Sequence, residues 1–293
     1  MRNRFLAAAV LALTTISTGA EEEARTAKAQ ALSAYFGAVV LPGGARGFCP
    51  AGVSFAGFGG MPFVLTRQVD YGNGFGGATY ALDPGAFRVE VGARSRVVTP
   101  VCATLNPAVD KTELNTILLA GDFGVGDADM PTKIQVVGEV RTVDGESLRG
   151  LEIDSIYPPD TGSNLLRAAV YDPADGTIDT SGPASNAYCP KQQTSKVVKL
   201  TFSGGVRGAN GGTLVDNAAA MAAILVLGVD SEGTRTVLNP FALRDDDNDN
   251  FLDACFGDEV DGLTLIRVSV NSHVFFSPMN APNEAAAVDV GSP

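Results

Sequence analysis

Several features that carry specific chemistry are scarce or missing in this chain. Tryptophan is absent and histidine occurs once, which disfavours sugar-stacking platforms and metal sites built on several imidazoles. Basic residues are outnumbered, with 21 Lys and Arg against 33 Asp and Glu, and such a chain repels phosphate backbones. We therefore expect no nucleic-acid partner. Beyond residue 20 no apolar run is long enough to span a bilayer, so we expect no transmembrane segment in the mature chain.

The first 20 residues have the layout of a secretory signal peptide. Arg2 and Arg4 form a short positive segment, residues 5–16 are apolar, and small residues precede a cleavage site after Ala20. The alternative is a buried N-terminal helix, but the charged flank, the length of the apolar run and the cleavage site all favour a signal. Cleavage leaves 19 basic and 33 acidic residues, a net charge of −14. The sequence thus predicts a secreted, periplasmic or cell-surface protein.

The cysteines form an even set, which in an exported protein predicts disulfides. They are Cys49, Cys102, Cys189 and Cys255, and no C-x-x-C spacing indicates a zinc site. Four cysteines allow three pairings. We favour Cys49–Cys102 and Cys189–Cys255, because each pair then stays within one half of the chain.

Beyond residue 37, short apolar runs alternate with turns rich in Gly and Pro, a pattern typical of β-sandwiches. Residues 196–202 alternate apolar and polar side chains, which predicts a half-buried strand with Lys199 and Thr201 on its polar face. Residues 224–238 predict a hairpin. We expect an all-β fold of the immunoglobulin-like β-sandwich type, as one large domain or two consecutive ones. A mixed α+β fold is the alternative.

Changes in composition divide the mature chain into two halves. Residues 21–36 are acidic at first and then Ala-rich, which favours a helix or a flexible segment. We expect a first β-rich domain over 37–157 and a linker or loop region over 158–190, where turn residues are frequent. A second β-rich domain follows over 191–293.

Metal chemistry is concentrated in residues 244–255, which read R-D-D-D-N-D-N-F-L-D-A-C. Carboxylates at alternate positions of a tight loop can converge on one ion, with a main-chain carbonyl completing the set. Calcium takes six to eight oxygen ligands and tolerates irregular geometry. The sequence therefore predicts a calcium site whose ligands come from Asp245, Asp247, Asp249, Phe251 (through its carbonyl) and Asp253.

This segment resembles the calcium loops of thrombospondin type 3 repeats, which follow the pattern D-x-D-G-x-x-D-x-C. Asp247, Asp249, Asp253 and Cys255 match that pattern, and Asn250 stands where the family has glycine. The resemblance covers residues 247–255 and implies a local calcium loop, since the family's repeated array is absent. Such an ion would hold a long loop and a disulfide in place. A solvated acidic loop without metal is the alternative.

We identify no catalytic residue and no cofactor other than calcium. The leading hypothesis is an exported, calcium-binding β-sandwich protein with a structural, interaction or adhesion role toward a macromolecular or surface partner. The alternative is a calcium-dependent extracellular hydrolase that cleaves a polymer through paired carboxylates.

Overall fold

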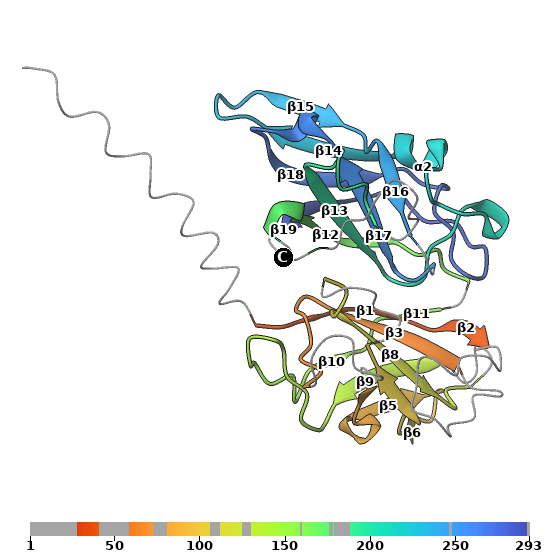
Figure 1. Cartoon of the computed structure of the whole chain (residues 1–293). Helices are drawn as coiled ribbons and strands as arrows, with labels where there is room; N and C mark the ends of the chain where they lie inside the picture. Colours follow the sequence, from red (N-terminus) through yellow and green to blue (C-terminus); the bar gives the residue numbers. More distant parts are fainter. Residues whose placement is uncertain are drawn as a thin grey trace, which may run out of the picture.

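The computed structural model describes most of the chain beyond the predicted signal peptide. The described residues are 28–40 (side chains of 37–40 excepted), 59–72, 81–105, 112–124, 130–158, 160–175, 178, 188–245 and 248–291. They form a nearly all-β protein of the β-sandwich class, as the sequence predicts, in two halves that Figure 1 shows one above the other.

The N-terminal half packs two sheets around one core. The seven-stranded sheet has the order β11 (Ile156–Tyr157), β1 (Ala31–Tyr35), β3 (Gly59–Leu65), β8 (Thr116–Gly121), β7 (Cys102–Thr104) and β4 (Ala81–Leu82), with β2 (Gly37–Val40) beside β3. The four-stranded sheet has the order β10 (Glu152–Ile153), β9 (Pro131–Val136), β5 (Phe87–Val91) and β6 (Arg96–Val98). Side chains alternate along each strand, so Met61 and Phe63 of β3 meet Phe87 and Val89 of β5 in the core.

Residues 31–35 form a strand, so the helix predicted over 21–36 is wrong there. β1 lies between β3 and β11 and is hydrogen-bonded to both. Alanine favours a helix by only a fraction of a kcal/mol per residue, and pairing on two sides outweighs that preference. Residues 21–27 lie outside the described part of the chain.

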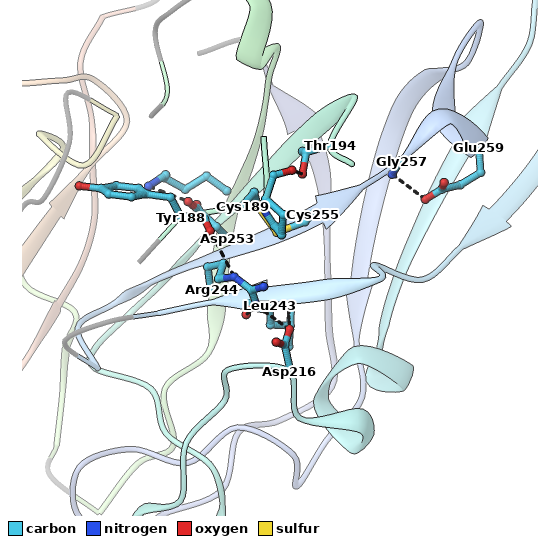
Figure 2. Close-up of a disulfide and its surroundings, with 12 residues drawn as sticks. Tyr188, Cys189, Thr194, Asp216, Leu243, Arg244, Asp253, Cys255, Gly257 and Glu259 are labelled. Atoms are coloured by element: carbon cyan, nitrogen blue, oxygen red, sulfur yellow. Dashed lines mark hydrogen bonds and ion pairs between the residues drawn. A yellow bond between two sulfur atoms is a disulfide. The ribbon is translucent and has the colours of Figure 1, made fainter. Parts of the chain in front are cut away.

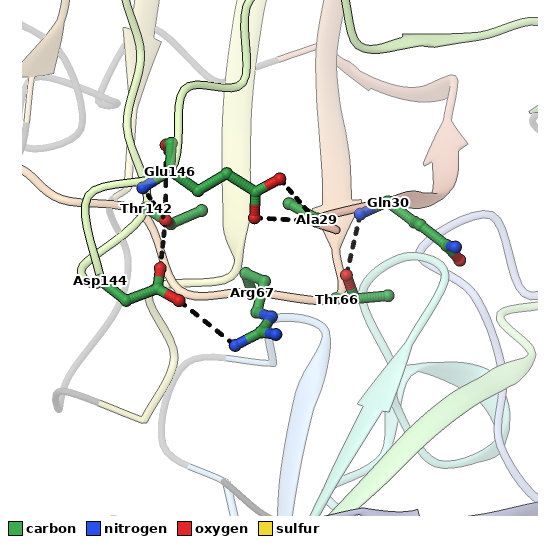
Figure 3. Close-up of polar contacts among 7 residues, drawn as sticks. All are labelled: Ala29, Gln30, Thr66, Arg67, Thr142, Asp144 and Glu146. Carbon is green, nitrogen blue, oxygen red and sulfur yellow. Dashed lines mark hydrogen bonds and ion pairs between the residues drawn. The ribbon is translucent and has the colours of Figure 1, made fainter. Parts of the chain in front are cut away.

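A turn at residues 142–146 holds the start of β1 in place (Figure 3). Within this turn Gly145 has a φ of 88°, which a residue without a side chain adopts at little cost. Both carboxylate oxygens of Glu146 accept the Ala29 main-chain N–H, at 3.1 and 3.0 Å. The turn therefore ties the entry to β1 to a segment more than a hundred residues away.

The C-terminal half is one eight-stranded sheet folded over its main core, and a smaller buried cluster surrounds Cys189 and Cys255. Its order is β15 (Arg235–Leu238), β14 (Ile224–Val229), β18 (Thr264–Val270), β19 (Ala286–Gly291), β12 (Leu165–Tyr171), β13 (Lys196–Phe202), β17 (Phe251–Phe256) and β16 (Ala242–Arg244). Ile224 and Val226, near one end of this order, share a core with Val198 and Leu252, near the other end. The two ends of the sheet therefore face each other, as the layers of a sandwich do.

In the C-terminal half, the predicted hairpin is present, whereas the predicted linker contains a strand. The hairpin predicted over 224–238 is confirmed, because β14 and β15 pair in antiparallel register. The linker predicted over 158–190 contains β12, which pairs with β13 and β19, so the second half begins earlier than predicted. The short helix α2 (Ala218–Ala223) leads into β14. No helix in the described ranges has the length and hydropathy needed to cross a membrane.

Candidate functional site

The two halves meet over the outer faces of their sheets. Across β1, β3 and β8, the paired residues Ser33, Val64 and Thr116 share one face, and all three are buried. On the other side of the interface, Lys199 and Thr201 of β13 are 3% and 2% exposed. The half-buried strand predicted for this segment is therefore wrong, because the N-terminal half covers its polar face.

Lys199 lies in this interface between two carboxylates. Its Nζ is 2.6 Å from Oε1 of Glu113 in the N-terminal half and 3.2 Å from Oδ1 of Asp253 on β17. The first contact is a hydrogen bond, and the second is an ion pair without hydrogen-bond alignment. All three side chains are at most 7% exposed, and the Phe251 ring centroid lies 5.7 Å from the same Nζ. Little water reaches these charges, so their mutual attraction is weakly screened.

Strand pairing sets the contact between Lys199 and Asp253. The two residues lie directly opposite each other in the antiparallel register of β13 and β17, so their side chains leave the sheet on the same face. Glu113 reaches them from the segment that precedes β8. A second polar contact crosses the same interface, where Nδ2 of Asn250 donates to Oγ1 of Thr116 at 3.0 Å.

Tyr35 adds a third connection between the halves. Its hydroxyl donates to the main-chain carbonyl of Thr161 at 2.9 Å. Its ring lies against Gly204, where an added Cβ would come within 2.8 Å of the Tyr35 Cγ atom. Burial raises the pKa of the Tyr35 phenol, as expected for a hydroxyl removed from water.

The acidic loop connects β16 to β17, and the structure describes part of it. Asp247 lies outside the described residues. Oδ1 of Asp245 accepts the Asn248 main-chain N–H at 2.8 Å, and Oδ1 of Asp249 accepts the Phe251 N–H at 2.6 Å. Asp245 and Asp249 thus flank the tip of the turn, where alternate carboxylates are chemically suited to calcium.

Asn250 and Asp253 have roles that the resemblance does not predict. Asn250, at the family's glycine position, is buried and donates to Thr116 and to the Phe202 carbonyl. The positive φ of the turn falls at Asn248, at 56°. The carboxylate of Asp253 pairs with Lys199, and a calcium ion would have to compete for it.

Metal ligation by the predicted set remains a prediction. Phe251, the expected carbonyl ligand, is the first residue of β17. Within the residues that the structure describes, no three Asp, Glu, His or Cys side chains converge as a metal site, and Asp247 lies outside those residues.

The predicted disulfide between Cys189 and Cys255 is confirmed (Figure 2). Both cysteines are buried, and Cys255 lies on β17 two residues beyond Asp253. Beside them, the buried Arg244 donates to the Tyr188 carbonyl at 3.2 Å. The segment 188–190, which precedes β13, is thereby held against β16 and β17.

The other predicted disulfide is only partly described. Cys102 is disulfide-bonded, whereas Cys49 lies outside the described residues. The pairing of Cys49 with Cys102 therefore stays a prediction.

Sequence reasoning missed Glu113 and the burial of Lys199. The available signal was weak: Lys199 and Thr201 alternate with apolar residues along the strand, which indicates a polar face but does not show that another part of the chain covers it. Glu113 stands in a short segment without any motif.

Comparisons with known proteins assign no family. No protein-family model matches the chain, and no curated protein matches it. A solved structure described as the tetra-tandem repeat in the extending region of a large adhesion protein aligns with 80% of this chain at 13% identity. The alignment spans 46% of that protein chain and has a TM-score of 0.19, which is too low to support any argument about fold or function.

Proposed function

We propose that this protein is exported and acts outside the cytoplasm as a calcium-stabilised structural or binding module. The buried disulfide between Cys189 and Cys255 is the observation that carries the proposal. Disulfides of this kind persist in oxidising compartments and are rare in the cytosol. The signal-peptide layout of residues 1–20 supports the same location.

A binding or structural role, toward a macromolecule or a surface, fits the way in which the halves are joined. The interface between them carries the buried ion cluster of Lys199 and the hydrogen bond between Asn250 and Thr116. Buried polar contacts are satisfied only in one relative arrangement, so they favour a fixed orientation of the halves. A fixed orientation keeps the outer surfaces in a constant relation to a partner.

Calcium would act at the turn between β16 and β17. Asp245, Asp247 and Asp249 supply carboxylates there, and Asp253 remains with Lys199. Extracellular modules bind calcium with Kd values of about 10⁻⁴–10⁻³ M. A weak site would thus be occupied outside the cell, and the ion would offset the repulsion among the acidic side chains of the turn.

Thermal unfolding of residues 21–293 in millimolar calcium and in chelator tests the metal proposal. Calcium should raise the midpoint of the native protein and leave that of the Asp247→Asn, Asp249→Asn variant unchanged. A matched control, Asp154→Asn with Asp289→Asn, removes two exposed carboxylates elsewhere and should respond to calcium as the native protein does. Equal midpoints of the native protein with and without calcium would contradict the proposal.

Export is tested separately by sequencing the N-terminus of the protein recovered outside the cytoplasm. The proposal expects Glu21 as the first residue. Recovery of the chain only inside the cell, with its first 20 residues attached, would exclude export.

A further inference from the structure

The cluster around Lys199 has the components of an amide-forming site. It contains a primary amine, a carboxyl group on the neighbouring strand and a second carboxylate hydrogen-bonded to the amine. We propose that Nζ of Lys199 and Cγ of Asp253 condense into an intramolecular amide bond, with Glu113 carrying the proton. The product is a covalent modification that links β13 to β17.

Burial prepares the reactants. In water an amine is protonated and a carboxyl group is ionised, and these charged forms do not react with each other. Lys199, Glu113 and Asp253 are at most 7% exposed, and the Phe251 ring lies on one side of the amine. Removal from water disfavours charged groups, so transfer of a proton from the ammonium to a carboxylate becomes accessible. The neutral amine that results is a nucleophile.

The sheet supplies the proximity that the reaction needs. Lys199 and Asp253 are directly opposed on hydrogen-bonded strands, and Nζ already lies 3.2 Å from Oδ1 of Asp253. Reactive groups held in a suitable geometry reach effective concentrations of about 10⁵–10⁸ M. No diffusional encounter is required, because folding itself brings the two groups together.

The hydrogen bond to Glu113 assigns the roles of the two carboxyl groups. Nζ of Lys199 donates to Oε1 of Glu113 at 2.6 Å, which places Glu113 to take a proton from the amine. Asp253 is fixed to the same sheet as Lys199, whereas Glu113 belongs to the other half of the protein. Asp253 is therefore the acyl group and Glu113 the proton carrier.

The step balances without an oxidant or a second substrate. Lys199 first passes one proton to Asp253. The neutral Nζ then attacks Cγ of protonated Asp253, a C–N bond forms, and ionised Glu113 removes a proton from the nitrogen. Glu113 then returns that proton to the departing hydroxyl as the C–O bond breaks, and water leaves. The overall change converts one ammonium and one carboxylate into one amide and one water.

The chain contains an internal comparison on the same strand. Lys196 and Asp172 form an ion pair at 2.5 Å, but their side chains are 31% and 43% exposed. Water stabilises both charges there, so the neutral reactants are not favoured and this pair should remain an ion pair.

Mass spectrometry of the full chain, expressed with its own signal and then reduced and denatured, tests the proposal. The intact mass should fall about 18 Da below that of the uncondensed sequence, which corresponds to one lost water. Proteolysis should release a branched peptide that joins the segments of Lys199 and Asp253, while the segments of Lys196 and Asp172 appear as separate linear peptides.

Three variants assign the chemistry. Lys199→Arg keeps a cation but cannot form the amide, and should show the uncondensed mass. Glu113→Gln removes the proton carrier and should also keep the uncondensed mass while it folds. Asp253→Asn can still react by losing ammonia, which lowers the mass by about 17 Da. Native protein that is folded, by circular dichroism, yet has the uncondensed mass would overturn the proposal, and so would a branched peptide joining Lys199 to Glu113.

Discussion

Lys199 and Glu113 lie 86 residues apart in the sequence and in different halves of the molecule, yet their side chains are joined by a buried hydrogen bond of 2.6 Å. Each of these charges leaves water only when the other half is in place. The stability of each half therefore depends on its contact with the other, and that dependence can be measured.

Replacement of Lys199 by methionine should destabilise the protein strongly. The variant keeps the length of the side chain but leaves Glu113 and Asp253 as two buried carboxylates that face each other. Removal of one partner from a buried ion pair costs on the order of 3–5 kcal/mol, and loss of the proposed amide link to Asp253 adds to that cost. Urea unfolding at pH 7 measures the loss of unfolding free energy.

Two controls distinguish the stability lost with the buried charge cluster from the effect of removing any lysine. Glu113→Gln blocks the proposed amide but keeps Lys199 and Asp253 as an ion pair, so it should cost less than Lys199→Met. Lys191→Met removes an exposed lysine next to β13 and should change stability by less than about 0.5 kcal/mol. A Lys199→Met protein as stable as the Lys191→Met protein would contradict the role of the cluster.

A methyl group added at position 204 should weaken the packing between the halves and lower the stability of the protein. In Gly204→Ala the new Cβ would lie 2.8 Å from the Tyr35 Cγ atom, so the ring must move and its hydrogen bond to Thr161 is strained. Overpacking of this kind typically costs about 1–3 kcal/mol. The matched variant Gly291→Ala meets only an ordinary contact at 3.8 Å and should be nearly neutral. Equal melting temperatures for the two variants would count against the packing of Tyr35 on Gly204.

Loss of the confirmed disulfide should also be costly. Cys189 and Cys255 are separated by 66 residues, and opening a loop of that size costs about 4.4 kcal/mol in the chain-entropy description. The Cys189→Ala, Cys255→Ala double variant should lose that amount in urea unfolding under non-reducing conditions. If the variant and the native protein have the same midpoint, the disulfide does not stabilise the fold.

The exposed pair of Asp172 and Lys196 predicts a pH effect of known sign. A hydrogen bond from Lys196 to the carboxylate lowers the pKa of Asp172 below its ordinary value of 3.8, and the Ala174 main-chain N–H acts in the same direction. The native state thus favours the ionised form. The associated stability is present above pH 3.8 and is lost as the pH falls through the lowered pKa.

Carboxyl-carbon NMR titration measures this shift directly. The pKa of Asp172 should move up toward 3.8 in Lys196→Met and stay unchanged in Lys191→Met. An unchanged Asp172 titration in Lys196→Met would show that the lysine is not the cause.

Local patterns in the sequence predicted the fold class, the hairpin at 224–238 and the pairing of Cys189 with Cys255. Each of these depends on neighbouring residues or on compartment chemistry. The strand at 31–35 and the burial of Lys199 could not be predicted in the same way. Both depend on partners far away in the chain, and an alternating strand has the same pattern whether its polar face meets water or another domain.

For the acidic loop too, the sequence predicts only part of the arrangement. The spacing of its carboxylates is visible in the sequence, but the sequence does not reveal that Lys199 lies opposite Asp253 or that Asn250 turns inward to Thr116. A motif gives the residue types that are suited to a metal, and the surrounding sheet decides which of them are already engaged.

Hydrogen exchange across a urea series, followed peptide by peptide, tests most directly whether the two halves form one body. Peptides from β3 in the N-terminal half and from β13 in the C-terminal half should lose protection at the same urea concentration, because each half buries charges of the other. Separate midpoints for the two sets of peptides would contradict the account, since the halves would then unfold independently.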